Sequence, residues 1–405
     1  MVYPRVSLYA LMLASAGIPL YIHLPRFASV NLGLGLGAIG TILLLIRFID
    51  LVQDPFLGWA IDRWPRAQVW FAMLSACGLA FGFPMLFLLV PGPNIVPALI
   101  AILILLFSAY SLGMILLYGR SATLAARPVP QELMKVSAFR EGGMLAGVII
   151  AAIAPAVFVG FGAGRDGYAA FGVFLGAVAV FTALVTRPIW QRRPIASETL
   201  SLSGLANAGA LRLLLLALVN SLPVALTSTL FLFFVEDRLR LSGMAGGMLI
   251  LFFLCAGLTV PFWAWLSNRI GGKRTLLIAM PLSIIGFVGA GALAPENPMG
   301  FAAICVASGM ALGADMVVLP AMFSVVLTRQ GLNASSAFGL WSLAGKLGLA
   351  LAAFVTLPLL ERAGFTPGQP NSAEALTLLN LTYAVLPCLL KILALGVVLT
   401  LPTED

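Results

Sequence analysis

Charged residues are scarce in this chain of 405 residues, of which 9% are Asp, Glu, Lys or Arg and 61% are hydrophobic. Soluble globular domains carry about 25% charged residues, so this composition excludes a soluble globule. Histidine occurs once, and the four cysteines lie in apolar runs without metal-site spacing. Nucleophile-elbow and phosphate-loop motifs are absent from the sequence. We therefore expect no enzyme activity, no catalytic residues and no cofactor.

Long apolar runs are what the chain has instead. Each is long enough to cross about 30 Å of hydrocarbon as a helix rising about 1.5 Å per residue. The sequence predicts an all-α polytopic membrane protein with twelve transmembrane helices. The predicted spans are residues 6–27, 36–60, 68–90, 95–119, 137–161, 167–187, 211–236, 244–267, 274–294, 299–327, 335–360 and 376–401.

The net charge of +8 follows the topology, because the basic residues are not gathered in one patch. We expect a lipid bilayer and no nucleic acid as partner. With a cytoplasmic N-terminus, fourteen Lys and Arg residues fall on the cytoplasmic side and five on the other. Positive residues favour the cytoplasmic side, which predicts a bacterial cytoplasmic (inner) membrane protein with both termini inside.

A polar stretch from Arg187-Pro188 to about Ala210 divides the chain in two. We predict an N-terminal six-helix bundle at 1–188, a cytoplasmic linker at 189–210 and a C-terminal six-helix bundle at 211–405. Basic loops follow the second span, at residues 58–66, and the eighth, at 265–274. Repeated halves with a site at their interface near the midplane are typical of secondary transporters. The alternative is that any short cytoplasmic loop tends to be basic.

The strongest local signal is a cluster of charge in the second span, formed by Arg47, Asp50 and Asp54. At 100° per residue these positions lie within about 60° of one another on a helix. Charge inside a membrane costs at least a few kcal/mol per group, which favours a functional stripe. The two carboxylates could share Na⁺ or a proton. The alternative is a structural salt bridge with Arg47, but apolar residues could replace a purely structural pair at little cost.

Five segments together resemble one family of transporters. They are Arg47-x-x-Asp50-x-x-x-Asp54-Pro55-x-x-Gly58, Ser137-Ala-Phe-Arg140-Glu141-Gly, Leu222-Pro223-x-Ala-x-Thr-Ser-Thr-Leu-Phe-Leu-Phe-Phe, Gly313-Ala-Asp315 and Gly345-Lys346. The chain resembles the glycoside–pentoside–hexuronide:cation symporters of the major facilitator superfamily, the relatives of melibiose permease. The resemblance implies the major facilitator fold of two six-helix bundles. It also implies that Asp50 and Asp54 are cation ligands and that Arg47 limits their accumulated negative charge.

The same resemblance also implies functions for other charged residues inside the predicted spans. It assigns Arg140 to substrate binding and Lys346 to coupling between the halves. The alternative is that both cations merely neutralise the acids of span 2. We expect Glu141 and Asp315 to be gate, interbundle hydrogen-bond or substrate residues.

Two further expectations concern the ends of the helices. Lys391 interrupts span 12, and single polar residues near helix ends more often reach the interface than bind ligands. By the superfamily motif, we expect Asp62 to pair with nearby basic residues and hold the cytoplasmic side closed. The predicted gating residues are Asp62, Arg63, Arg66 and Arg269.

Departures from the family limit the substrate. Sugar-carrying members have acids in helices 1 and 4, whereas spans 1 and 4 here contain no Asp or Glu. Matching to the family puts Ile115 at the helix-four acid, Gly119 at its aromatic and Leu112 at a hydroxyl linked to Na⁺. This disfavours a galactoside and suits an anionic or amphipathic solute.

These observations predict a monomeric secondary transporter of a small-molecule substrate. We expect a small organic solute, sugar- or glycoside-like or anionic, carried by alternating access and coupled to Na⁺ or H⁺. The alternatives are a transporter of lysophospholipids or other amphipaths, and a non-transporting membrane assembly factor. The assembly factor is disfavoured because it would not need the coupling acids.

Overall fold

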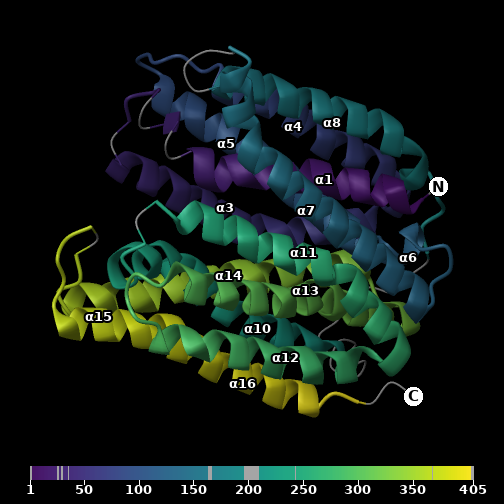
Figure 1. Cartoon of the computed structure of the whole chain (residues 1–405). Helices are drawn as coiled ribbons and strands as arrows, with labels where there is room; N and C mark the ends of the chain where they lie inside the picture. Colours follow the sequence, from purple (N-terminus) through teal and green to yellow (C-terminus); the bar gives the residue numbers. More distant parts are fainter. Residues whose placement is uncertain are drawn as a thin grey trace. The chain divides into compact units, whose positions relative to one another are not determined.

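A computed structural model describes residues 2–24, 27–28, 31–34, 36–162, 167–195, 209–241, 243–366 and 368–402. The described residues are almost entirely helical (Figure 1). Hydrocarbon offers no hydrogen-bond partners, so a spanning segment must satisfy its backbone groups internally, and a helix does so. The side chain of Arg47 lies outside what the structure describes, although its backbone is part of a helix.

The chain divides into two compact units. Unit 1 contains Met1–Leu200 and Gly331–Leu340, and unit 2 contains Ser201–Gln330 and Trp341–Asp405. Helix α14 (Ala334–Arg362) therefore begins in unit 1 and continues in unit 2. The division at residues 188 and 210 that the sequence predicts stays a prediction.

Unit 1 is a helical bundle. Its elements are α1 (Tyr3–Ile18), the π-helical η1 (Pro19–His23), α3 (Leu36–Arg63), η2 (Pro65–Ala67), α4 (Gln68–Phe87), α5 (Ile95–Gly119), α6 (Ser121–Leu124), α7 (Pro130–Gly160) and α8 (Tyr168–Trp190). Helix α1 packs along α7, α4 packs along α8 and α5, and α3 packs along α5. A Cβ added at Gly143 of α7 would lie 2.1 Å from the Ser7 carbonyl oxygen of α1. Small residues thus let these two backbones approach closely, as is common between membrane helices.

Unit 2 is also a bundle of packed helices. Its elements are α10 (Ala210–Phe233), the π-helical η3 (Phe234–Arg238), α11 (Ala245–Ile270), α12 (Gly272–Val288), η4 (Gly289–Ala292), α13 (Pro298–Arg329), the rest of α14, α15 (Ala373–Asn380), the π-helical η5 (Leu381–Val385) and α16 (Leu386–Leu399). Helix α13 packs against α11 and α12, and α16 packs against α10 and α12. Gly309 and Gly313 of α13 face backbone carbonyls of α11, so the two helices meet without intervening side chains. The buried rings of Phe234 and Tyr383 stack on one another within the hydrophobic core of the unit.

Where the structure describes their residues, the twelve predicted spans fall on helices, with ends that differ by a few residues. Among the described residues, ten helices are long and apolar enough to cross a membrane. The other two are α1, which has 16 residues before its π-helical extension, and the charged α3. The twelve-helix expectation is confirmed, because α1 with η1 and α3 complete the set.

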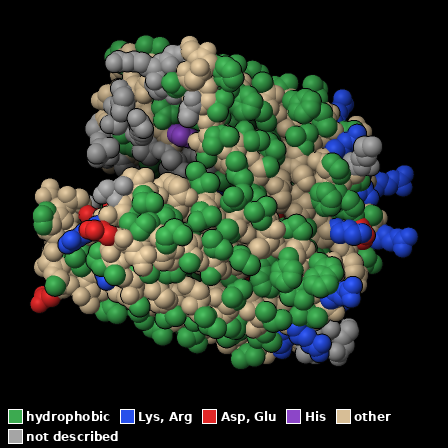
Figure 2. All heavy atoms as spheres, viewed as in Figure 1, with side chains coloured by type: hydrophobic (Ala, Val, Ile, Leu, Met, Phe, Trp, Pro, Cys, Tyr) green, Lys and Arg blue, Asp and Glu red, His purple; other side chains and the backbone are tan. Residues whose placement is uncertain are grey.

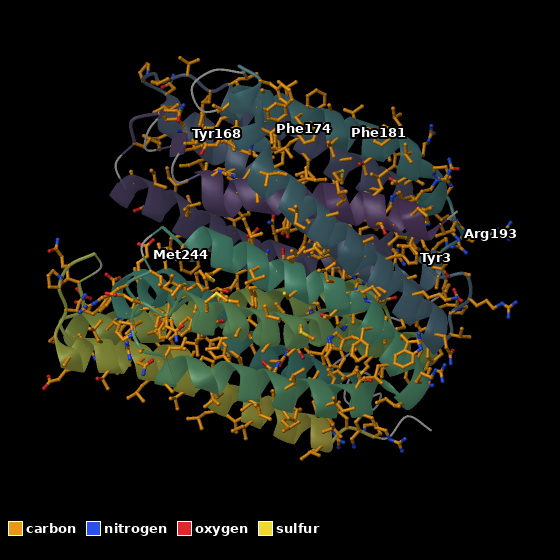
Figure 3. All side chains as sticks on the ribbon, viewed as in Figure 1. Tyr3, Tyr168, Phe174, Phe181, Arg193 and Met244 are labelled. Carbon is orange, nitrogen blue, oxygen red and sulfur yellow. The ribbon has the colours of Figure 1, made fainter. Side chains whose placement is uncertain are left out.

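Surface composition agrees with a membrane setting. Hydrophobic side chains cover the helix flanks in Figure 2, and Lys and Arg gather at helix ends. On α8, the phenyl ring of Phe181 is 58% exposed, and Phe174 and Phe181 lie along the helix in Figure 3. The exposed Arg193 follows the end of the same helix. Exposed apolar flanks of this extent are what lipid would cover.

Candidate ion and substrate sites

The two acids of α3 are completely buried inside unit 1. Asp50 and Asp54 have no exposed surface and lie four residues apart, on one face of the helix. Gln53 Nε2 donates a hydrogen bond to Asp50 Oδ1 at 2.7 Å, and Ser108 Oγ of α5 donates to Gln53 Oε1 at 2.7 Å. A polar chain therefore links the acid to a second helix. Sequence reasoning missed Gln53 and Ser108, although a glutamine three residues from Asp50 inside a span was a readable signal.

The backbone around Asp54 is crowded by the first turns of α14. Pro55 has no N–H, so the Leu51 carbonyl loses its intrahelical donor one turn earlier. A Cβ on Gly58 would lie 2.5 Å from the Ser335 carbonyl oxygen, and one on Gly339 would lie 2.8 Å from the Asp54 carbonyl oxygen. Both glycines are therefore required by close approach of the two helices. The acids therefore lie in a tightly packed segment of unit 1.

Arg140 of α7 is 1% exposed and its charge is compensated by its neighbour Glu141. Its Nε donates to Glu141 Oε1 at 2.9 Å, and its Nη2 donates to Ser137 Oγ at 2.9 Å. The guanidinium carbon lies 3.6 Å from the centre of the Tyr118 ring, whose hydroxyl donates to Glu141 Oε1 at 3.0 Å. The long side chain of Arg140 lies over the Tyr118 ring. In this conformation its guanidinium reaches the carboxylate of Glu141, the next residue on the same helix. The positive charge of Arg140 and the negative charge of Glu141 therefore largely cancel within this cluster.

Asp62 pairs with a basic residue that the sequence analysis did not select. Its Oδ1 lies 3.6 Å from Nη2 of Arg120, the buried residue that ends α5. Burial lowers the pKa of the Arg120 guanidinium, and the negative charge of Asp62 opposes that shift. Asp62 Oδ2 also accepts a 2.5 Å hydrogen bond from the backbone N–H of Ser336, in the first turn of α14. A carboxylate at this position satisfies an N–H that has no intrahelical partner and matches the positive end of the helix dipole.

The other three predicted gating residues are exposed. Arg63 and Arg66 line a surface hollow together with Arg192 and Arg193 near the end of α8. Arg269 of α11 lies with its guanidinium carbon 5.3 Å from the Trp265 ring centre. Their gating role stays a prediction.

Lys391 corrects one expectation. The sequence placed it at the membrane interface, but it is 5% exposed within unit 2 and ion-pairs with Asp315 Oδ2. Its Nζ also donates to Asn220 Oδ1 of α10 at 2.6 Å. The basic partner that Asp315 lacks on its own helix therefore comes from α16. Lysine, aspartate and asparagine inside three apolar runs were a signal, because an intramembrane charge requires a partner.

Lys346 lies on α14 within unit 2 and is partly buried. Two residues later, a Cβ on Gly348 would lie 2.4 Å from the Ser221 hydroxyl oxygen, so α14 approaches α10 closely here. The expected meeting of Lys346 with the acids of α3 stays a prediction.

The departures from the sugar-carrying pattern have structural counterparts. Ile115 and Leu112 of α5 are buried, with 2% and 4% exposure. A Cβ on Gly119 would lie 2.5 Å from Ser335 Cα, so an aromatic side chain cannot occupy that position in this packing. Recognition of a substrate in unit 1 therefore cannot use these three positions in the way the resemblance implies for sugar carriers.

Comparison with known proteins supplies independent findings. The family described as MFS/sugar transport protein matches residues 6–405. The isoprimeverose transporter of Lactiplantibacillus pentosus is 25% identical over 400 residues, which cover 90% of this chain and 81% of that protein.

Solved structures show the same fold at low sequence identity. The crystal structure of a bacterial homologue of the iron transporter ferroportin in the outward-facing state has a TM-score of 0.68 and 16% identity, covering 98% of this chain and all of that one. The same homologue with soaked iron has a TM-score of 0.67 and 16% identity, covering 98% of each chain. At this identity the likeness concerns the fold alone.

Proposed function

Because this chain belongs to the MFS/sugar transport protein family, we propose that it is a cation-coupled secondary active transporter of a sugar-like solute. Chains of this family are membrane transporters and not enzymes. The observation that carries cation coupling is the pair of fully buried carboxylates Asp50 and Asp54. In this proposal the protein works as a monomer, by alternating access.

The burial of both acids is the physical reason for coupling. Two carboxylates on adjacent turns, removed from water, repel one another and are stabilised by a shared Na⁺ or by a shared proton. The hydrogen bond from Gln53 keeps the Asp50 carboxylate oriented after the cation dissociates. The coupling ion in this proposal is Na⁺ or H⁺.

The substrate class follows from the compensation of Arg140. An anionic solute would need a guanidinium with free hydrogen-bonding capacity, but Arg140 is engaged by Glu141, Ser137 and Tyr118. A neutral polyhydroxylated solute can exchange hydrogen bonds with such a cluster without separating charge. The related isoprimeverose transporter also supports a sugar-like substrate.

Neutralising the acids tests the proposal. In proteoliposomes, Asp50→Asn with Asp54→Asn should abolish uphill accumulation of the transported sugar and leave downhill exchange partly intact. Glu374→Gln removes an exposed carboxylate at the start of α15 and is the matched control, expected to accumulate like the parent. Concentrative uptake by the doubly neutral variant would show that the carboxylates are structural.

The same vesicles identify the ion. Sodium coupling requires uptake that depends on external Na⁺ without pH change, whereas proton coupling requires acidification of the lumen with the solute. Uptake that is insensitive to both gradients would remove cation coupling from the proposal.

The proposed location is the bacterial cytoplasmic membrane with both termini inside. The segregation of basic residues supports this topology. A single cysteine placed between Pro91 and Asn94, in a cysteine-free background, should react with an impermeant reagent added outside. One placed between Thr199 and Ser203 should not, and the reverse pattern would contradict the topology.

A further inference from the structure

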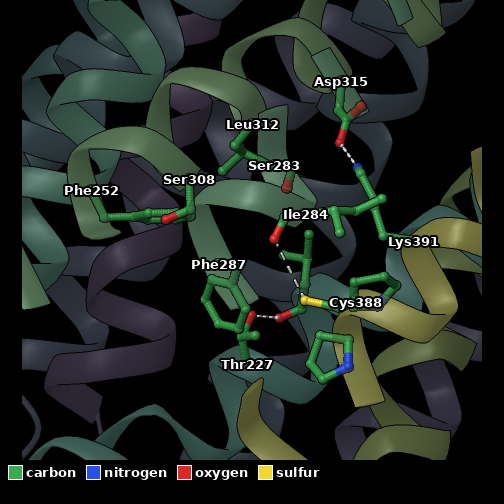
Figure 4. Close-up of a pocket in the computed structure, with 13 residues that line it drawn as sticks. Thr227, Phe252, Ser283, Ile284, Phe287, Ser308, Leu312, Asp315, Cys388 and Lys391 are labelled. Carbon is green, nitrogen blue, oxygen red and sulfur yellow. Dashed lines mark hydrogen bonds and ion pairs between the residues drawn. The ribbon is translucent and has the colours of Figure 1, made fainter. Parts of the chain in front are cut away.

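A hollow opens inside unit 2 beside the buried ion pair of Asp315 and Lys391 (Figure 4). It is an open hollow bounded by α10, α11, α12, α13 and α16. Phe252, Phe287 and Leu312 form much of its apolar wall. Small-molecule sites typically have this character, with a mostly apolar lining and a few placed polar groups.

Three polar groups in the lining of the hollow can accept a hydrogen bond, namely those of Asp315, Ser308 and Thr227. Asp315 is 8% exposed, and its Oδ2 is bonded to Lys391, while its Oδ1 has no hydrogen-bond donor among the residues that the structure describes. Ser308 Oγ donates to the Ile304 carbonyl at 2.6 Å, and Thr227 Oγ1 donates to the Val224 carbonyl at 3.1 Å. Their hydroxyl protons are thus committed, and their oxygens can accept. A buried acceptor without a donor is costly, so a ligand that donates gains by filling it.

Charge narrows the class of ligand. The ion pair has no net charge, so an anion would meet the open carboxylate oxygen of Asp315, and a cation would lie beside the ammonium of Lys391. A neutral hydroxyl donates to that oxygen without either repulsion. The aromatic rings of Phe252 and Phe287 offer surfaces for an apolar part of the same molecule.

We propose that this hollow binds a neutral glycoside with an apolar aglycone, through a sugar hydroxyl that donates to Asp315 Oδ1. The residues that line the hollow belong to unit 2, whereas the acids of α3 belong to unit 1. The proposal rests on the proposed function only for the choice of a glycoside among neutral hydroxylated amphipaths.

Direct binding to the purified full-length protein tests it, with 4-nitrophenyl β-D-xyloside as the probe and no ion gradient present. Leu312→Phe fills the hollow without touching the ion pair and should weaken binding by about tenfold or more. Met310→Phe adds bulk to an exposed position of the same helix and should bind like the parent. Equal affinity of the parent and Leu312→Phe, or no binding by the parent, would overturn the proposal.

A second measurement locates the probe. Cys388 lines the hollow, with Sγ 3.9 Å from the Ile284 carbonyl oxygen. The bound xyloside should slow the reaction of this thiol with N-ethylmaleimide, followed at its peptide by mass spectrometry, and leave the exposed Cys77 unaffected. Protection of neither thiol, or of both equally, would place the probe elsewhere and refute the site.

The two proposals fail separately. The double variant Asp50→Asn with Asp54→Asn should retain xyloside binding and Cys388 protection, because both substitutions lie in unit 1. Loss of coupled uptake with retained binding supports both proposals. If that variant still accumulates the solute against a gradient and binds the xyloside normally, the result refutes the coupling role of Asp50 and Asp54 and leaves the proposed glycoside site standing.

Discussion

The ion pair between Asp315 and Lys391 allows a quantitative test of how buried charge is compensated in unit 2. The two side chains are 8% and 6% exposed, and Lys391 also donates to Asn220. Replacing Lys391 by Met leaves a carboxylate buried without its partner and removes the donor to Asn220 Oδ1. Replacing Asp315 by Asn leaves a buried ammonium. Each single change therefore removes compensation, whereas the double change removes both charges together.

The expected magnitudes follow from burial. Breaking a buried pair by removing one partner costs about 3–5 kcal/mol, because an uncompensated charge remains. Replacing both partners with groups of similar volume is often neutral or stabilising. The double variant should therefore have a free energy of unfolding close to that of the parent. In a double-mutant cycle the coupling energy between the two sites should be several kcal/mol, well above the ~0.5 kcal/mol within which independent sites are additive.

Thermal unfolding of purified protein in one detergent ranks the parent, the two single variants and the double variant, and denaturant titration gives their free energies of unfolding. Lys135→Met is the matched control, because Lys135 makes a 2.8 Å pair with Glu132 but is 53% exposed. It should unfold like the parent, since exposed pairs contribute little. Additive effects of the two core substitutions, with a double variant as unstable as their sum, would refute compensation within this pair.

Two further predictions concern packing against the first turn of α14. Gly119→Ala places a Cβ 2.5 Å from Ser335 Cα and should destabilise by about 1–3 kcal/mol, whereas Gly142→Ala meets nothing within 4 Å and should not destabilise; thermal unfolding compares them. Asp62→Ala removes the acceptor of the Ser336 N–H and should raise amide hydrogen exchange at the start of α14, whereas unchanged exchange there would show that this contact does not hold the helix end.

Much of the architecture could be predicted from the sequence, because the cost of leaving backbone groups unsatisfied in lipid makes every long apolar run a helix. In the part of the chain that the structure describes, the twelve predicted spans lie on helices. Helix ends were less predictable. The chain leaves α-helical geometry at residues 19–23, 234–238 and 381–385, where π-helical turns continue the spans without a distinctive local composition.

The presence of charged residues inside the spans could be predicted from the sequence, but their partners could not. Hydropathy and spacing identified Asp50, Asp54 and Arg140 as charges that a membrane would not tolerate without compensation. Angular spacing on an ideal helix gave no reason to pair Arg140 with its neighbour Glu141, because adjacent side chains diverge. In the structure Tyr118, which comes from another helix, contacts both members of this pair.

The sequence alone determined how many helices cross the membrane and which residues must be shielded from lipid, because both depend on the transfer free energy of local segments. Partners were decided by tertiary structure. Lys391 finds Asp315 across 76 positions of sequence, and Asp62 reaches Ser336 across 274. Such pairings depend on how helices pack, which close approaches at glycines such as Gly58 and Gly313 make possible. The sequence indicates that a charge inside a span needs a partner, and only the packing of the helices determines which side chain provides it.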